Sequence, residues 1–167
     1  ELFLVSFVEE SGGDRLVLLR VDPAGNLVEA LETPLDSGDV EPVVPPVVLD
    51  EYFLVPFRTY GADGRIRVLR VGRGTFPDSQ LFEVPLEDRY AGGPFVLAPG
   101  SNPDVVMLFY ATADGRIVGE EFTDGLVRTS TPTVTVPADG AAMDLVAARA
   151  DDTYLFAVAS PSSDGVV

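Results

Sequence analysis

Hydrophobic runs separated by polar turns recur along this chain in a unit of about 50 residues. The apolar run 52–55 leads through a polar turn into residues 63–66, and the run 106–109 leads in the same way into residues 114–117. Arg65 and Arg116 therefore hold equivalent positions in successive units. Similar units begin near residues 2 and 154. A repeat of this length that carries several short strands is typical of a β-propeller blade.

The hydrophobic pattern predicts an all-β fold, with three or four short strands in most repeats. We expect a β-propeller segment of about three and a half four-stranded blades, with repeats near residues 1–37, 38–87, 88–136 and 137–167. The first repeat begins in its second strand, and the fourth ends early. The predicted strands that follow cover residues 16–21, 27–35, 43–49, 51–57, 65–71, 80–86, 95–98, 105–111, 117–122, 126–134, 143–148 and 154–159.

The second strand of each repeat is almost continuously apolar, whereas the third strand alternates. In residues 65–71, for example, Ile66 and Val68 alternate with Arg65 and Arg67. A continuous apolar run indicates a strand that is buried on both faces. Each blade of a propeller lies between two others, so its inner strands are covered on both faces. A two-sheet sandwich covers one face only, and the pattern therefore favours a propeller.

An open arc of blades would leave one blade face exposed at each end. If about eight apolar side chains on a face contribute about 1.5–3 kcal/mol each, exposing them costs on the order of 12–24 kcal/mol. This cost equals or exceeds the net stability of a typical domain, about 5–15 kcal/mol. We therefore expect the ring to be completed, either by missing blades of a longer chain or by another chain.

The chain has a formal charge of −16, from 27 acidic residues and 11 basic ones, and all the basic residues are arginine. This charge disfavours binding to nucleic acid or to an anionic membrane surface. No apolar run approaches the roughly 18 residues that could span a bilayer, so we expect no membrane insertion.

Histidine and cysteine are both absent from the sequence. A serine–histidine triad, a thiol nucleophile and a zinc centre bound by histidine or cysteine are therefore excluded within this chain. We expect no cofactor. The absence of cysteine leaves the compartment open, with an extracellular location favoured.

The third repeat resembles a blade of the fungal and bacterial fucose-binding lectins. The resemblance rests on the apolar run 105–110, the turn and strand start at 113–117, and the Phe-Thr-Asp-Gly step at 122–125. Lectins of this family are six-bladed propellers, formed by one chain or by association of short chains. The resemblance implies the same blade architecture here.

The sugar-binding residues of that family are not matched. In those lectins an Arg on the second strand and a Glu shortly after the turn hold the sugar, and Trp or Tyr stacks on it. Met107 stands at the place of the Arg and Gly119 at the place of the Glu. The neighbouring Glu120 could replace that Glu only through a register shift. The second repeat has Phe53 or Leu54, and Val68, at the matching positions, and the chain has no Trp.

Positive charge is concentrated in the second repeat, at Arg58, Arg65, Arg67 and Arg70. Arginine forks bind carboxylates and stack on planar groups, so a carbohydrate or anion contact is one interpretation. The other is that these residues form the solvated side of an alternating strand and pair with nearby acids. The candidate ligand-binding residues are Arg58, Arg67 and two tyrosines expected in loops, Tyr60 and Tyr90.

Adjacent carboxylates such as Glu120 and Glu121 offer a different chemistry. Two carboxylates about 5–10 Å apart can hydrolyse glycosides. Asp36, Asp39 and Glu41 form a further candidate set for calcium, but their spacing fits no EF-hand loop, and we predict no metal site. The sequence is best interpreted as a non-catalytic binding or scaffold propeller with a glycan or protein partner. A glycoside hydrolase-type propeller is the alternative.

Overall fold

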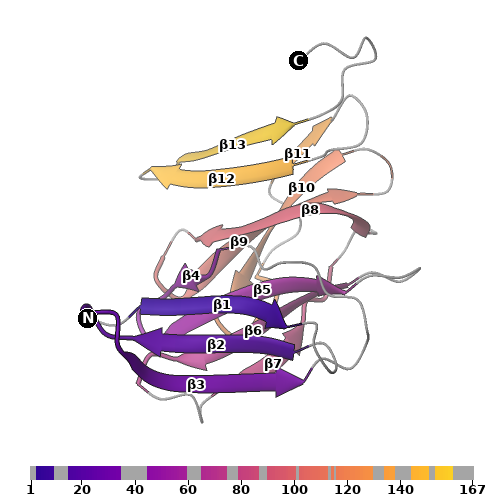
Figure 1. Cartoon of the computed structure of the whole chain (residues 1–167). Coiled ribbons are helices and arrows are strands. Elements are labelled where there is room, and N and C mark those ends of the chain that lie inside the picture. The colour runs from indigo at the N-terminus through magenta and orange to yellow at the C-terminus, as the bar shows by residue number, and fades with distance from the viewer. Residues whose placement is uncertain are drawn as a thin grey trace. The chain divides into compact units, whose positions relative to one another are not determined.

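The structure of the chain is a computed structural model that forms two compact units, Glu1–Glu83 and Val84–Val167 (Figure 1). The described secondary structure consists of antiparallel β-strands, so the predicted all-β class is confirmed for this part of the chain. The described residues are 3–9, 15–34, 45–59, 65–74, 79–86, 90–100, 102–112, 114, 116–129, 134–137, 144–150 and 153–159.

The first unit contains two sheets, in which each strand pairs with its neighbour in sequence. The first sheet has the order β1 (Phe3–Glu9), β2 (Arg15–Val21) and β3 (Leu27–Pro34). The second sheet has the order β4 (Val47–Val48), β5 (Tyr52–Thr59), β6 (Arg65–Gly72) and β7 (Gln80–Glu83).

The second unit also contains two sheets. One has the order β11 (Val134–Pro137), β10 (Arg116–Thr123), β9 (Val105–Thr112) and β8 (Tyr90–Pro99). The other consists of β12 (Asp144–Ala150) and β13 (Thr153–Ala159), and β12 lies beside β8. The described strands of the four sheets lie within residues 3–34, 47–83, 90–137 and 144–159.

A hydrophobic core joins the two sheets of the first unit. Its buried members are Leu16, Leu18, Phe53, Val55, Phe57, Leu69 and Val71, with Leu31 partly buried against them. Because side chains alternate along a strand, these residues define one face of β5 and β6. On the opposite face, Leu54, Ile66 and Val68 are fully buried as well. The prediction that the second strand is buried on both faces is therefore confirmed for β5.

The same holds in the second unit, where all eight residues of β9 are buried. Their register with β10 is unbroken, and it places Gly119 opposite Phe109. A Cβ atom at Gly119 would lie 2.8 Å from Cε1 of Phe109, closer than normal packing permits. Glycine at this position therefore leaves room for the Phe109 ring beside β10.

The hairpin between β2 and β3 is closed by Asp22, whose carboxylate oxygens accept hydrogen bonds from three donors. These are the backbone N–H groups of Ala24 and Asn26 and the side-chain amide of Asn26. Gly25 has a φ of 85°, a conformation that glycine adopts without strain. The bonds from Asn26, first that of its side chain, lower the pKa of the Asp22 carboxyl.

Two strand predictions differ from the structure. The outer strand of the third repeat was expected at 126–134, but residues 124–125 form a turn and Leu126 has a φ of 56°, which is incompatible with an extended strand. The outer strand is instead β11 (Val134–Pro137). The inner strand predicted at 43–49 contracts to the two residues of β4, after Pro45 and Pro46, which lack the N–H that a sheet ladder needs.

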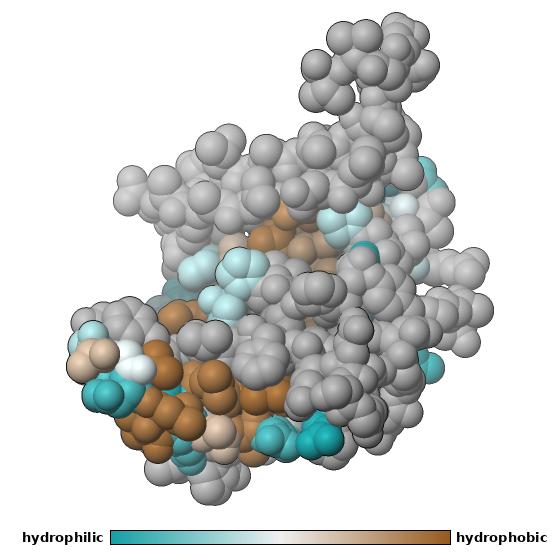
Figure 2. Space-filling view, in the orientation of Figure 1, coloured by the Kyte–Doolittle hydropathy of each residue, from teal (hydrophilic) through white to brown (hydrophobic). Residues whose placement is uncertain are grey.

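Hydrophobic side chains gather over β2 and β3 on the side that faces the viewer in Figure 2. Within the described residues β3 pairs with β2 alone, so β3 is an edge strand. Leu27 and Val28 at its start are 61% and 55% exposed. Among the described residues, no helix has the length and apolarity needed to cross a membrane.

Candidate ligand pocket

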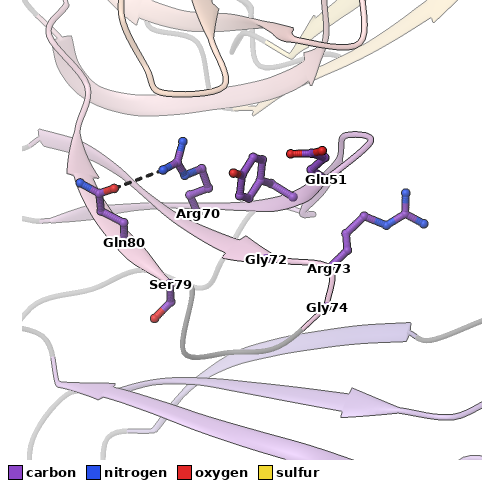
Figure 3. A pocket seen from close by; sticks show the side chains of 8 residues that line it. Glu51, Arg70, Gly72, Arg73, Gly74, Ser79 and Gln80 are labelled. Carbon is purple, nitrogen blue, oxygen red and sulfur yellow. Dashed lines mark hydrogen bonds between the residues drawn. The ribbon is translucent and has the colours of Figure 1, made fainter.

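An open pocket of about 520 Å³ lies in the first unit, at the end of the sheet β4–β7 where β6 ends and β7 begins (Figure 3). Three segments of the second repeat supply its walls: the start of β5, the end of β6 with its following turn, and the start of β7. The lining residues are Glu51, Tyr52, Arg70, Gly72, Arg73, Gly74, Ser79 and Gln80. Most of these side chains are polar or charged, so the pocket suits a hydrophilic ligand.

Arg70 is held in place by two aromatic rings and one amide. Its guanidinium carbon lies 4.6 Å from the centroid of the Tyr52 ring and 5.1 Å from that of Phe82. Its Nη2 also donates a hydrogen bond of 3.2 Å to Oε1 of Gln80. The strand register explains the cluster, because Arg70 lies opposite Gln80 and Phe82 lies two positions further along the same strand. The Arg70 guanidinium is therefore oriented before any ligand arrives.

A second guanidinium belongs to Arg73, in the turn after β6. Its Nη1 donates to the carbonyl oxygen of Asp50 at 2.9 Å and to that of Leu49 at 3.4 Å. These bonds fix the side chain against the turn before β5, while Arg73 itself remains exposed. In Figure 3 the Glu51 carboxylate lies between the side chains of Arg70 and Arg73. Among the described residues that line the pocket, Arg70 and Arg73 are thus the positive groups and Glu51 is the negative group.

One wall of the pocket is held from the first sheet by Arg20 of β2. This side chain is 2% exposed and donates hydrogen bonds to the carbonyl oxygens of three consecutive residues. The acceptors are Gly72 at 2.9 Å, Arg73 at 2.7 Å and Gly74 at 2.6 Å. Glu29 of β3 lies 3.6 Å from Nε of Arg20 and balances its charge. Arg20 is thus a positioning residue for the pocket.

The structure does not bring together the two arginines predicted as ligand contacts. Arg67 lies opposite Phe57 in the register, and Arg58 lies opposite Ile66. Because side chains alternate along each strand, Arg58 and Arg67 project from opposite faces of the sheet. Both are half-buried, and neither lines the pocket. Arg65, from the same cluster, forms an ion pair of 2.7 Å with Glu83.

Of the two tyrosines predicted as ligand contacts, the structure describes only one. Tyr60 lies outside the described residues. Tyr90 was expected in a loop, but it is the first residue of β8 and is 9% exposed. Its ring packs edge-to-face against Phe95 and Tyr110, with centroid distances of 6.3 Å in both cases. The placement of Tyr90 in a loop was wrong, because β8 begins before the register irregularity that separates Tyr90 from Phe95.

The positions of the third repeat that the proposed resemblance aligned with a lectin sugar site are buried. Met107 and Gly119 are buried, and Gly119 lacks room for any side chain beside Phe109. The register of β9 and β10 shows no shift that would move Glu120 into its place. Glu120 is instead fully buried, accepts a hydrogen bond from the Tyr110 hydroxyl and lies 3.5 Å from Nη1 of Arg128.

The adjacent carboxylates Glu120 and Glu121 do not form a pair. Successive residues of a strand project to opposite faces, so the two carboxylates lie on opposite sides of β10. Glu121 accepts a hydrogen bond from the Thr129 hydroxyl at 2.7 Å. In the described part of the chain, no three or more acidic, histidine or cysteine side chains are grouped to hold a metal ion. The calcium candidates Asp36, Asp39 and Glu41 lie outside that part.

Sequence reasoning named Arg70 in the arginine cluster but missed its partners. Tyr52, Gln80 and Phe82 come from neighbouring strands, and only the register brings them beside Arg70. The available signal was the alternation of residues 65–71, which places Arg70 on the face opposite to Arg65 and Arg67.

The sequence matches no protein-family model, and comparison with curated proteins and with solved structures finds no similar protein.

Proposed function

We propose that this chain is a segment of a β-propeller and acts as a non-catalytic binding module, with a glycan bound in the pocket at Arg70. The observation that carries this proposal is the pocket itself. It has the volume of a small-ligand site, about 520 Å³, and a polar lining. A concave site of this size fits one or two sugar rings better than the flat surface of a protein partner.

The propeller architecture is supported by burial on both faces of the inner strands. Leu54, Ile66 and Val68 are buried on the face of β5 and β6 that lies opposite to the core shared with β2. A two-sheet sandwich would leave that face in solvent. The 50-residue repeat supports the same arrangement, in which successive sheets lie around one axis.

A crystal structure of the chain tests the architecture. We expect the four sheets to follow one another around a common axis, with the first strand of each four-stranded sheet, β4 and β8, innermost. Two sheets stacked as a closed sandwich, with the β4–β7 sheet open to solvent on one face, would contradict the proposal.

The partner that completes the ring is proposed to be another sheet of the same kind, packed on the apolar face over β2 and β3 (Figure 2). Sedimentation equilibrium and hydrogen exchange of β2 test this. Dimerisation with protection of β2 identifies a second copy as the partner. If the protein is a monomer and becomes more stable when adjoining blades of a longer reading frame are included, the ring is completed by the same polypeptide. A monomer that gains nothing from either contradicts the proposal.

Binding without catalysis is tested with a glycan array followed by product analysis. We expect at least one glycan to bind wild-type protein and to be recovered intact. Arg15→Gln is a matched control, because Arg15 is an exposed arginine of the first sheet, paired with Glu32 and remote in sequence from the pocket. Binding that survives replacement of Arg70 and Arg73 would contradict the location of the site. Cleavage of the bound glycan would contradict its non-catalytic nature.

A further inference from the structure

We infer that the pocket selects a sugar that carries a carboxylate, such as a uronic acid. This inference rests on the proposed function and specifies its ligand. It follows from the orientation of Arg70, from the charge balance of the pocket, and from the uncharged polar groups at the start of β7.

Arg70 has the geometry of an anion anchor. Tyr52 and Phe82 contact its guanidinium at 4.6 and 5.1 Å, and Gln80 orients it through a hydrogen bond. A side chain that is already immobilised loses little further entropy when a ligand binds. A planar guanidinium can offer parallel N–H donors to a carboxylate, which is also planar. The flanking rings reduce access of water and so strengthen the interaction.

Among the described residues that line the pocket, a carboxylate accompanies the guanidinium groups, and this favours a single negative charge on the ligand. Arg70 and Arg73 contribute two positive charges in a chain whose net charge is −16. Glu51, which lines the same pocket, repels a doubly charged anion more than a singly charged one. A carboxylate therefore fits better than a phosphate. The Glu51 oxygens are acceptors for the hydroxyl groups of a sugar.

The remaining lining groups match a polyhydroxylated ligand. Ser79 offers a hydroxyl that both donates and accepts, and Gln80 offers an amide N–H₂ group in addition to the oxygen that binds Arg70. These groups can form hydrogen bonds with the hydroxyl groups of the sugar, while Arg70 binds its carboxylate. One face of the Tyr52 ring is occupied by Arg70, so that face serves to position the cation and does not serve as a sugar platform.

Isothermal titration with four probes tests the inference on the full chain: the methyl glycosides of glucuronic acid, glucose, galacturonic acid and galactose. We expect each acid to bind about tenfold more tightly than its neutral counterpart, the difference that one charge-assisted hydrogen-bond pair supplies. Arg70→Gln should abolish this preference, and Arg70→Lys should reduce it, because lysine retains the charge but lacks the fork. Arg15→Gln should retain it in full.

Two further measurements separate the possible failures. Ser79→Ala, which leaves Arg70 and its rings intact, should weaken acid and neutral probes equally. It keeps the test valid if Arg70 variants unfold, which circular dichroism would reveal. Equal binding of acid and neutral probes to wild-type protein overturns the acid preference and leaves the proposed glycan binding intact. Displacement of the acid probes by inorganic sulfate at equal concentration overturns the choice of a carboxylate. Binding of no glycan by probe or array overturns both proposals.

Discussion

Nη1 of Arg20 in β2 donates a hydrogen bond of 2.6 Å to the carbonyl oxygen of Gly74, 54 positions later in the chain. The same guanidinium binds the two preceding carbonyls, so one buried side chain connects the first sheet to the turn that follows β6. The hydrophobic core between the two sheets buries apolar surface, but it does little to fix their relative orientation, because apolar contacts are non-directional. Arg20 fixes where the end of β6 lies relative to β2.

Arg20→Met should therefore lower the free energy of unfolding by about 2–4 kcal/mol, since it leaves one buried carbonyl group and two partly buried ones without their donors. Urea denaturation measures this change. Arg15→Met is the matched control, because the exposed Arg15–Glu32 pair should contribute less than about 1 kcal/mol. Equal losses in the two variants would show that the bonds of Arg20 add nothing beyond ordinary surface charge.

Replacement of Gly119 by alanine should destabilise the second unit by about 1–3 kcal/mol, because the added methyl group meets the Phe109 ring. Thermal unfolding measures the loss. Gly74→Ala provides the comparison, since a Cβ atom there has nothing within 4 Å. That variant should be neutral or slightly more stable. A tolerated Gly119→Ala would mean that β9 and β10 pair in a different register.

The bond between Tyr110 and Glu120 should be worth about 1–3 kcal/mol, because Tyr110→Phe leaves a fully buried carboxylate without its hydroxyl donor. A double-mutant cycle with Glu120→Gln measures the coupling between the two side chains. Tyr52→Phe is the control, as it keeps the ring that contacts Arg70 and should change stability by less than about 0.5 kcal/mol. Additive effects of Tyr110→Phe and Glu120→Gln would argue against the bond.

The hairpin carboxylate Asp22 should titrate below the ordinary aspartate pKa of about 3.9. Its lowered pKa arises first from the side-chain hydrogen bond of Asn26. A group whose pKa is depressed by folding stabilises the folded state above its unfolded pKa, and this contribution is lost as the pH falls through the folded pKa. Stability should therefore decline on acidification below about pH 4.

Carbon-13 NMR titration of Asp22 measures this pKa directly. Asn26→Ala should raise it toward the ordinary value, because the largest cause of the shift is removed. Asp114 should also titrate low, first because Thr112 donates to its carboxylate and then because Arg116 does. Asp114 should keep its low pKa in Asn26→Ala. An Asp22 pKa that is ordinary in wild-type protein would contradict the hairpin geometry.

The strands with strong patterns were predictable from the sequence. The continuous apolar run of β9 and the alternation of β6 predicted both strands and their burial. A strand that is buried on both faces is apolar at nearly every position, whereas a strand with one more polar face alternates. The outer strand of the third repeat was not predictable. A single residue, Leu126, adopts a left-handed conformation, and leucine is not a residue type that predicts this conformation.

The pocket could be predicted only in part. Arg70 is visible in the sequence as one of several arginines, but its partners Tyr52 and Gln80 are set by the register of three strands. Arg20 resembled any other arginine at the end of an apolar strand. Its bonds to carbonyls more than 50 residues away depend on how two sheets pack, which local sequence patterns do not encode.

Leu27 and Val28 lie in solvent on a strand whose outer edge has open backbone groups among the described residues. Such an edge can recruit a second β-strand, and charged neighbours discourage this. Here Glu29 and Glu32 on the same strand supply the charge. Salt screens the repulsion between charged edges, so concentrated stocks of this protein should be kept at low ionic strength, where the molecules are prevented from growing into ribbons.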